Sequence, residues 1–173
     1  MRKREVFFGL LIGLSLVSSN LLSNTFQEQE GGRAGLAKAV AGAKVSLEQG
    51  LATVSRDGKP LSAKFEIEDG RLQLSVYRVN DDQFAEVILD PNTAAVYEVD
   101  QITSGGDYTV AQDQNAAMAK TKRSLQAVLA QVLKGNSGFR AVSIVPSLKD
   151  GHPVAQVALT KGDEWKTALE KLD

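Results

Sequence analysis

The 173-residue chain contains no cysteine, one histidine (His152), one tryptophan and four prolines. Without cysteine there can be no disulfide bridge, thiolate metal ligand, cysteine nucleophile or lipid-modified N-terminal cysteine. A single histidine cannot complete a transition-metal site of the common His/Cys type. The formal net charge of −1 also lacks the clustered basic excess typical of nucleic-acid-binding proteins. We therefore expect no metal, no cofactor and no nucleic-acid partner.

The usual catalytic motifs are missing too. Serines are numerous, but no Gly-x-Ser-x-Gly sequence occurs, and no glycine-rich phosphate loop follows a predicted strand. His152 stands in a predicted hairpin tip, where polar residues are expected. Asp81, Asp82 and Asp90 lack the spacing of a calcium-binding loop and read as turn residues. We assign no catalytic, cofactor-binding or metal-binding residue, and we expect the protein not to be an enzyme.

The N-terminus has the three-part pattern of a secretory signal peptide. A basic start at residues 2–4 precedes residues 6–17, which are apolar except for glycine and one serine, and residues 17–19 are small enough for cleavage. The apolar run is about a dozen residues, shorter than the roughly 20 that span a bilayer. We expect residues 1–19 to be a cleaved signal peptide. The alternative is an uncleaved anchor, with membrane contact only through residues 6–22.

This pattern predicts a periplasmic or extracellular protein, or one anchored in the inner membrane and facing the periplasm. Residues 20–43 follow the signal and are rich in Gln, Glu, Gly and Ala. That composition predicts a flexible spacer ahead of the folded part.

A short helix is expected to open the folded part. Ser46 and Gln49 have the spacing of a capping box. Leu47, Leu51 and Val54 recur at the spacing of one helix face. Gly50 costs helix stability, so its presence suggests close packing against a sheet.

Alternating apolar and polar residues then predict strands separated by turns. Asp69-Gly70 is a pair favoured in two-residue hairpin loops. Further turns are expected at residues 80–82 and 90–93, where Asn, Asp and Pro cluster.

The second half repeats this order with a longer helix. An apolar stripe predicts a helix over residues 115–134, and Asp150-Gly151 predicts another hairpin. Residues 163–173 have the local propensity of a helix. Their alignment with the segment that begins at Asp82 favours a strand, which is our prediction because tertiary context overrides propensity.

Two further groups of side chains stand out. Lys120, Lys122 and Arg123 form a basic patch on the predicted long helix, which reads as a solvated face; the alternative is contact with an acidic partner or lipid headgroups. Trp165, together with Phe84 and Phe139, is expected in the core or covering the sheet rather than acting as a binding anchor.

Superimposing the two Asp-Gly turns aligns a helix, a hairpin and a following segment in each half. The implied fold class is α+β, with helices packed on antiparallel β-sheet. We expect two tandem units, at residues 44–103 and 107–173.

The first half resembles the PepSY domain family in three segments. Val-Ser-Leu-Glu-Gln at 45–49 is similar to the opening helix of that family, and residues 66–72 are similar to its central hairpin. Tyr77 and residues 86–96 are similar to its closing strand pair. The family usually has alanine where Gly50 stands and glycine where Ala94 stands.

The resemblance implies tandem PepSY-like units with a cystatin-like or β-lactamase-inhibitor-like fold. It also implies an exported, non-enzymatic binding module that inhibits or regulates a secreted or periplasmic peptidase, or binds a peptide. Two alternatives stay open: a small-ligand-binding or enzymatic α+β domain with a deep pocket, and a membrane-tethered structural component.

Overall fold

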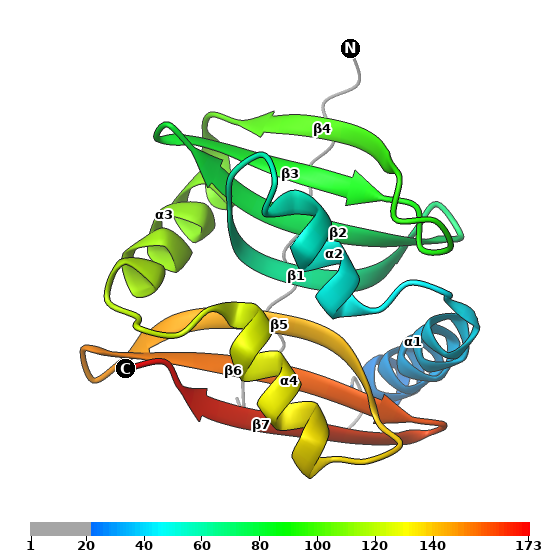
Figure 1. Cartoon of the computed structure of the whole chain (residues 1–173). Coiled ribbons are helices and arrows are strands. Elements are labelled where there is room, and N and C mark those ends of the chain that lie inside the picture. The colour runs from blue at the N-terminus through cyan, green and yellow to red at the C-terminus, as the bar shows by residue number, and fades with distance from the viewer. Residues whose placement is uncertain (1–21) are drawn as a thin grey trace.

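Helices and strands alternate in two rounds along the chain (Figure 1). The computed structural model describes residues 22–173, and this part is α+β as predicted, with four helices and one seven-stranded antiparallel sheet. The helices are α1 (Leu22–Gly42), α2 (Leu47–Val54), α3 (Gly105–Ala119) and α4 (Leu125–Gly135). The strands are β1 (Lys59–Glu68), β2 (Arg71–Asn80), β3 (Gln83–Leu89), β4 (Val96–Ile102), β5 (Arg140–Lys149), β6 (His152–Lys161) and β7 (Glu164–Lys171). The predicted signal peptide or anchor, residues 1–19, lies outside the described residues.

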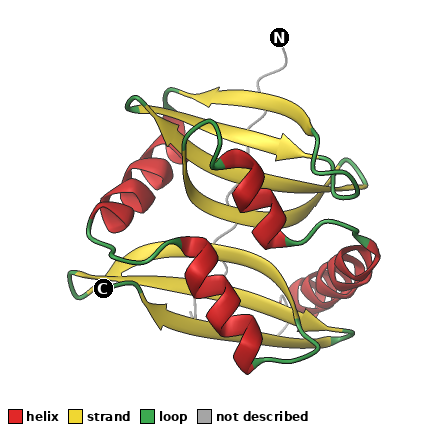
Figure 2. Ribbon diagram, in the orientation of Figure 1, coloured by secondary structure: helices red, strands yellow, loops and turns green. Residues whose placement is uncertain are grey.

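The sheet consists of two groups of strands that share one short join. Its order is β4-β3-β2-β1-β5-β6-β7, so β4 and β7 form the two edges. Two residue pairs connect β1 with β5: Ala63 with Ile144, and Lys64 with Ser143. A four-stranded group and a three-stranded group are therefore joined at the middle (Figure 2). Their identity as tandem PepSY-like units remains a prediction.

Each group carries a helix on the same face of the sheet, which we call the front face. In Figure 1, α2 lies in front of β1 and β2, and α4 lies in front of the second group. The opposite, or back, face carries α3. Tyr77 lies three positions after Leu74, which faces α2, so Tyr77 points to the back. There its hydroxyl bonds Asp107 of α3.

The local structure of α2 confirms the predicted start of the folded part. Ser46 is the N-cap, and the capping box with Gln49 is complete in both directions. Leu47, Leu51 and Val54 are buried on one side. Gly50 lies so close to the sheet that an added Cβ would stand 2.5 Å from Cδ2 of Leu74.

Both predicted Asp-Gly hairpins are present. Asp69 and Gly70 have φ values of +49° and +74°, and Asp150 and Gly151 have +51° and +79°. Positive φ at both central positions gives the turn whose twist matches that of the flanking strands.

The ambiguous C-terminal segment is a strand, as predicted. β7 pairs with β6 along its whole length. Leu172, just after β7, is fully buried, and its amide donates to Pro153 O at 2.9 Å. Pairing and burial thus outweigh the local helical propensity.

The flexible spacer predicted for residues 20–43 is wrong, because α1 occupies residues 22–42. Ala37 and Val40 of this helix are buried. Arg140 Nη1 donates to Ala43 O at 2.9 Å just beyond the helix end. Tertiary packing therefore stabilises a helix that the polar, glycine-containing sequence would scarcely form alone.

The single helix predicted over residues 115–134 is also wrong, because α3 and α4 are separate. Thr121 lies between them. Its hydroxyl accepts from the amide of Arg123 at 3.0 Å and donates to Leu172 O at 2.6 Å. Ser124 then caps α4 by accepting from the amide of Ala127. Side-chain bonding to the backbone at Thr121 and Ser124 thus competes with helix continuation.

Candidate peptide-binding edge

The polar residues noted in the sequence do not converge on a reaction centre. His152 opens β6, and its Nδ1 lies 3.2 Å from Oδ2 of Asp173 at an exposed end of the sheet. Asp81 and Asp82 form the β2–β3 turn, whereas Asp90 lies beyond the opposite end of β3. Between residues 22 and 173 no three His, Asp or Glu side chains are grouped to hold a metal ion.

Asp90 organises the turn in which it lies. Its Oδ1 accepts from the amides of Asn92 and Thr93 at 2.9 and 2.8 Å, and from the Thr93 hydroxyl at 3.0 Å. The hydrogen bond from the Asn92 amide, followed by that from the Thr93 side chain, lowers the pKa of the Asp90 carboxyl below its usual value. The carboxylate therefore serves turn formation.

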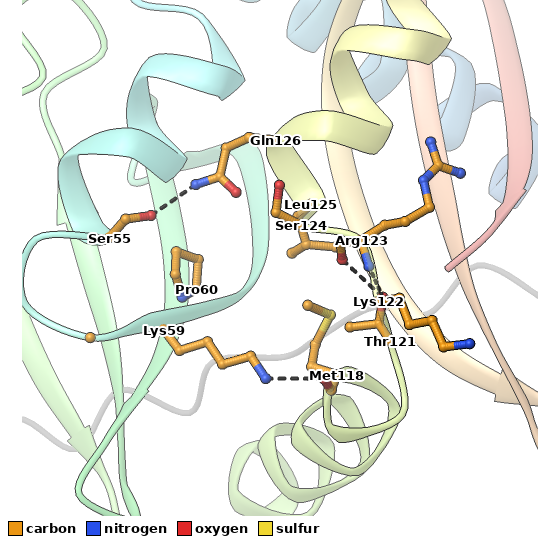
Figure 3. Close-up of a pocket in the computed structure, with 11 residues that line it drawn as sticks. Ser55, Lys59, Pro60, Met118, Thr121, Lys122, Arg123, Ser124, Leu125 and Gln126 are labelled. Carbon is orange, nitrogen blue, oxygen red and sulfur yellow. Dashed lines mark hydrogen bonds between the residues drawn. The ribbon is translucent and has the colours of Figure 1, made fainter. Parts of the chain in front are cut away.

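The predicted basic patch does not lie on one helix face. Lys122 and Arg123 belong to the connection between α3 and α4, and Lys120 is the C-cap of α3. With Lys59, Lys122 and Arg123 border a cleft of about 440 Å³ between the two groups of elements (Figure 3).

Two hydrogen bonds in this cleft hold the two groups of elements together. Lys59 Nζ donates to Met118 O at 3.0 Å. Gln126 Nε2 donates to Ser55 Oγ at 2.8 Å, which links α4 to the end of α2 (Figure 3). Arg123 is turned to Lys171 O, 2.9 Å from its Nη1. Lys59 and Arg123 thus make structural hydrogen bonds to backbone carbonyl groups.

The three singled-out aromatic residues are core or core-margin residues, as predicted. Phe84 is buried, and Phe139 and Trp165 are partly buried against the core. Phe139 lies under Lys166 Nζ at 4.2 Å, and Trp165 under Arg33 at 5.9 Å.

The front face is filled by side chains. The leucines that α2 and α4 direct into the core are at most 1% exposed: Leu47, Leu51, Leu125 and Leu129. The deep sheet-face pocket that the small-ligand alternative requires is therefore not on this face.

The edge strand β4 presents apolar side chains to solvent. Val96, Tyr97 and Val99 are 52%, 74% and 41% exposed. In the part of the chain that the structure describes, no strand pairs with the outer side of β4. An exposed edge with apolar side chains is a ready template for another strand.

The other edge strand, β7, carries more charged side chains than β4. Four of its eight residues are charged at neutral pH, Glu164, Lys166, Glu170 and Lys171, whereas β4 has two in seven, Glu98 and Asp100. Charged side chains on an edge are a common device against strand addition. The two edges thus differ in their readiness to accept a further strand.

The register divides the side chains of β4 between the two faces. Val99 pairs with Val87 and Asp100 with Glu86. Val87 follows the front-facing alternation of β3, and Glu86 faces the back. The front of β4 is therefore apolar around Val99, and its back carries Glu98, Asp100 and Ile102.

A hollow of about 410 Å³ lies at the C-terminal end of β4. Its apolar lining comes from Phe84, Ile102 and Tyr108, and Asp82 stands at its border. The Phe84 and Tyr108 rings meet edge to face, with centroids 5.6 Å apart. The hollow adjoins the row of back-face side chains on β4.

A buried carboxyl group lies directly inside this row. Glu86 is 3% exposed, and its Oε1 has no hydrogen-bond partner among residues 22–173. Burial raises its pKa to about 7; Lys64 opposes the rise, and Glu66 and Asp107 add to it. Burial, followed by the charges of Glu86 and Asp107, likewise raises the pKa of Tyr77.

Glu66, on the same face, is the stabilised counterpart of Glu86. Burial is the largest single effect and alone would raise its pKa. The ion pair with Lys64 at 2.6 Å and the hydrogen bonds from Ser75 at 2.6 Å and Gln73 at 3.1 Å together outweigh burial, so the pKa of Glu66 is lowered. The back face therefore holds one well-paired carboxylate and one poorly paired carboxyl.

Sequence reasoning found neither the open edge nor the buried acid. The extended segment at Val96–Val99 is visible in the sequence, but nothing local marks it as an edge. Glu86 reads as an ordinary outward-facing residue of an alternating strand. The charges that act on it belong to Lys64 and Glu66 of β1 and Asp107 of α3, which are distant from it in sequence.

No protein-family model matches the chain, and no curated protein matches it. A crystal structure described as a "putative lipoprotein" from Clostridium difficile is similar in part, with a TM-score of 0.39 and 14% identity. The match covers 74% of this chain and 95% of that one. Among the helices of residues 22–173, none is long and apolar enough to cross a membrane.

Proposed function

We propose that the protein is an exported, non-enzymatic binding module that holds an extended segment of another polypeptide along β4. The observation that carries the proposal is an edge strand of seven residues whose exposed side chains include Val96, Tyr97 and Val99. Strand addition supplies affinity through main-chain hydrogen bonds, and side-chain contacts supply specificity.

The identity of the partner class follows from the sequence resemblance. A PepSY-like module with an N-terminal export signal would meet its partner in the cell envelope or outside the cell. We propose a secreted or periplasmic peptidase as that partner, bound through an extended loop or terminus. The absence of a recognised catalytic motif in the sequence agrees with a binding role.

The test compares two matched substitutions on the two edges. Val99→Lys places a charge on β4, and Leu169→Lys does the same on β7, where Leu169 is 52% exposed. Both side chains are exposed, so we expect both variants to fold. Val99→Lys should abolish strand addition, because a charge on an edge opposes it, and Leu169→Lys should leave it intact.

Binding is measured against purified peptidases from the envelope fraction of the source cells and against a displayed library of random peptides. Inhibition of peptide cleavage is recorded for the same peptidases. Equal binding by the wild type and Val99→Lys would contradict the proposal. Loss of binding in Leu169→Lys alone would move the site to the other edge.

A further inference from the structure

The back face of β4 indicates which segment fits this edge. Resting on the proposed function, we infer that the bound segment places a cationic side chain against Asp100 and a bulky apolar side chain in the hollow between Phe84, Ile102 and Tyr108. These two contacts lie two residues apart on β4, on the same face of the sheet. Asp100 and the hollow would therefore contact two side chains that are two positions apart on one added strand.

The cationic position follows from the local charge. Asp100 lies on the outer strand, and Glu86 lies directly opposite it on β3. Cross-strand neighbours on one face have Cβ atoms about 5 Å apart. A lysine or arginine opposite Asp100 on an added strand would thus lie in the same cross-strand row as both carboxyl groups and would be attracted to them. An acidic residue there would meet repulsion.

The apolar position follows from the hollow. Its volume of about 410 Å³ is far larger than a single leucine side chain requires, and Phe84, Ile102 and Tyr108 provide its apolar surface. Full burial of a leucine or phenylalanine side chain strengthens binding by at least about tenfold. The hollow is thus suited to an anchor residue of the added strand.

A second copy of the chain is disfavoured in the register centred on Val99. Antiparallel pairing of β4 with itself about Val99 would set Asp100 of one copy opposite Glu98 of the other. Like charges directly opposite each other are destabilising. In this register a cationic segment of a different polypeptide is the more complementary occupant.

The order of the cationic and apolar residues in the bound segment depends on whether it pairs with β4 in the antiparallel or the parallel direction. In an antiparallel complex the residue opposite Ile102 precedes the residue opposite Asp100, which gives the pattern apolar-x-cationic. A parallel complex reverses the pattern to cationic-x-apolar. Position x faces the front, opposite Gln101 and diagonal to Val99, and a β-branched residue suits this half-exposed strand position.

The test uses labelled peptides with the mature wild-type protein and fluorescence anisotropy. The probe contains Leu-Thr-Lys-Val, its reversed order tests the parallel arrangement, and two changed peptides carry glutamate for lysine or glycine for leucine. We expect the glutamate peptide to bind roughly fivefold to tenfold more weakly, and the glycine peptide at least about tenfold more weakly. Added salt should weaken the lysine peptide most.

Charge exchange provides the decisive comparison. Asp100→Lys should reverse the preference, so that the glutamate peptide binds better than the lysine peptide. Glu164→Lys, the same charge change on β7, should leave the preference unchanged. Circular dichroism checks that both variants fold, and the peptide series on the wild type needs no variant.

The outcomes separate the two proposals. Binding that is lost in Val99→Lys but is indifferent to peptide charge and anchor overturns this inference and leaves the proposed function standing. Enrichment of library peptides without the cationic and apolar positions does the same. If neither the library nor the designed peptides bind, or if binding persists in Val99→Lys, the proposed function and this inference both fail.

Discussion

Glu86 on β3 lies directly opposite Asp100 on the edge strand β4. One carboxyl group is buried and the other is at the margin of the sheet. Glu86 affects the stability of the first group of strands, and Asp100 belongs to the surface where we propose that a partner binds. The cost of burying Glu86 is the basis of the first prediction.

Glu86→Gln should stabilise the protein above neutral pH. The pKa of Glu86 is about 7 in the folded protein, against an ordinary value of 4.5. Because the folded pKa is the higher, the wild type loses stability as pH rises from about 4.5 to 7. The loss approaches about 3 kcal/mol. Urea unfolding at pH 5 and pH 8 should show a smaller decrease for the variant, and equal decreases would contradict the prediction.

Glu66→Gln is the matched control, with the opposite sign expected. The pKa of Glu66 is lowered in the folded state by its contacts with Lys64 and Ser75. Its carboxylate therefore contributes stability above pH 4.5, and that contribution is lost as pH falls below this value. We expect Glu66→Gln to destabilise the protein at pH 7 by about 1–2 kcal/mol. A gain in stability at pH 7 would show that the Lys64 pairing is not favourable.

Ala94→Gly should stabilise the turn between β3 and β4. Ala94 has a φ of +59°, in the left-handed region where alanine is strained and glycine is not. We expect a gain of about 1 kcal/mol in the free energy of unfolding, reduced by the extra freedom of glycine in the unfolded chain. The same change at Ala95, which does not have positive φ, should be neutral or destabilising. Thermal unfolding of both variants would show the difference, and a loss at Ala94 would refute it.

Gly50→Ala should destabilise the protein although alanine favours helices. The added Cβ would lie 2.5 Å from Cδ2 of Leu74, so the core must shift. Overpacking of this kind costs about 1–3 kcal/mol, against a helical gain of up to about 1 kcal/mol. Gly35→Ala in α1 meets no atom within 4 Å and should be stabilising. Chemical denaturation should place the two variants on opposite sides of the wild type.

The two departures from the PepSY pattern, at Ala94 and Gly50, have different structural consequences, and membership of that family remains a prediction. The family's usual glycine at the position of Ala94 suits the positive φ found there. The family's usual alanine at the position of Gly50 does not fit beside Leu74 as it stands. Glycine at position 50 therefore suits this core, whereas alanine at position 94 lowers the stability of the protein.

Local signals in the sequence predicted the elements with short-range causes. The capping box at Ser46, the turns at Asp69 and Asp150 and the alternation of β1 and β2 depend on residues only a few positions apart. The same reasoning failed for α1 and for the break at Thr121. There the deciding contacts are with Arg140 and with Leu172, which are distant in the sequence.

The candidate site could not be predicted from the sequence, because it too depends on contacts between residues that are distant in the sequence. Strand character at Val99 is local, but its position at an edge depends on the order of all seven strands. The pKa of Glu86 depends on burial and on the charges of Lys64, Glu66 and Asp107, which come from other elements. A single sequence contains no short-range pattern for either property.

The sequence by itself determined the hairpins, the start of α2, the α+β class and the absence of cysteine chemistry, because each depends on composition or on neighbouring residues. Tertiary structure alone decided that β4 is an open edge, that Glu86 is buried beside Asp100 and that Phe84, Ile102 and Tyr108 border one hollow. These features arise from strand order and register, which bring distant segments together and set which side chains water can reach.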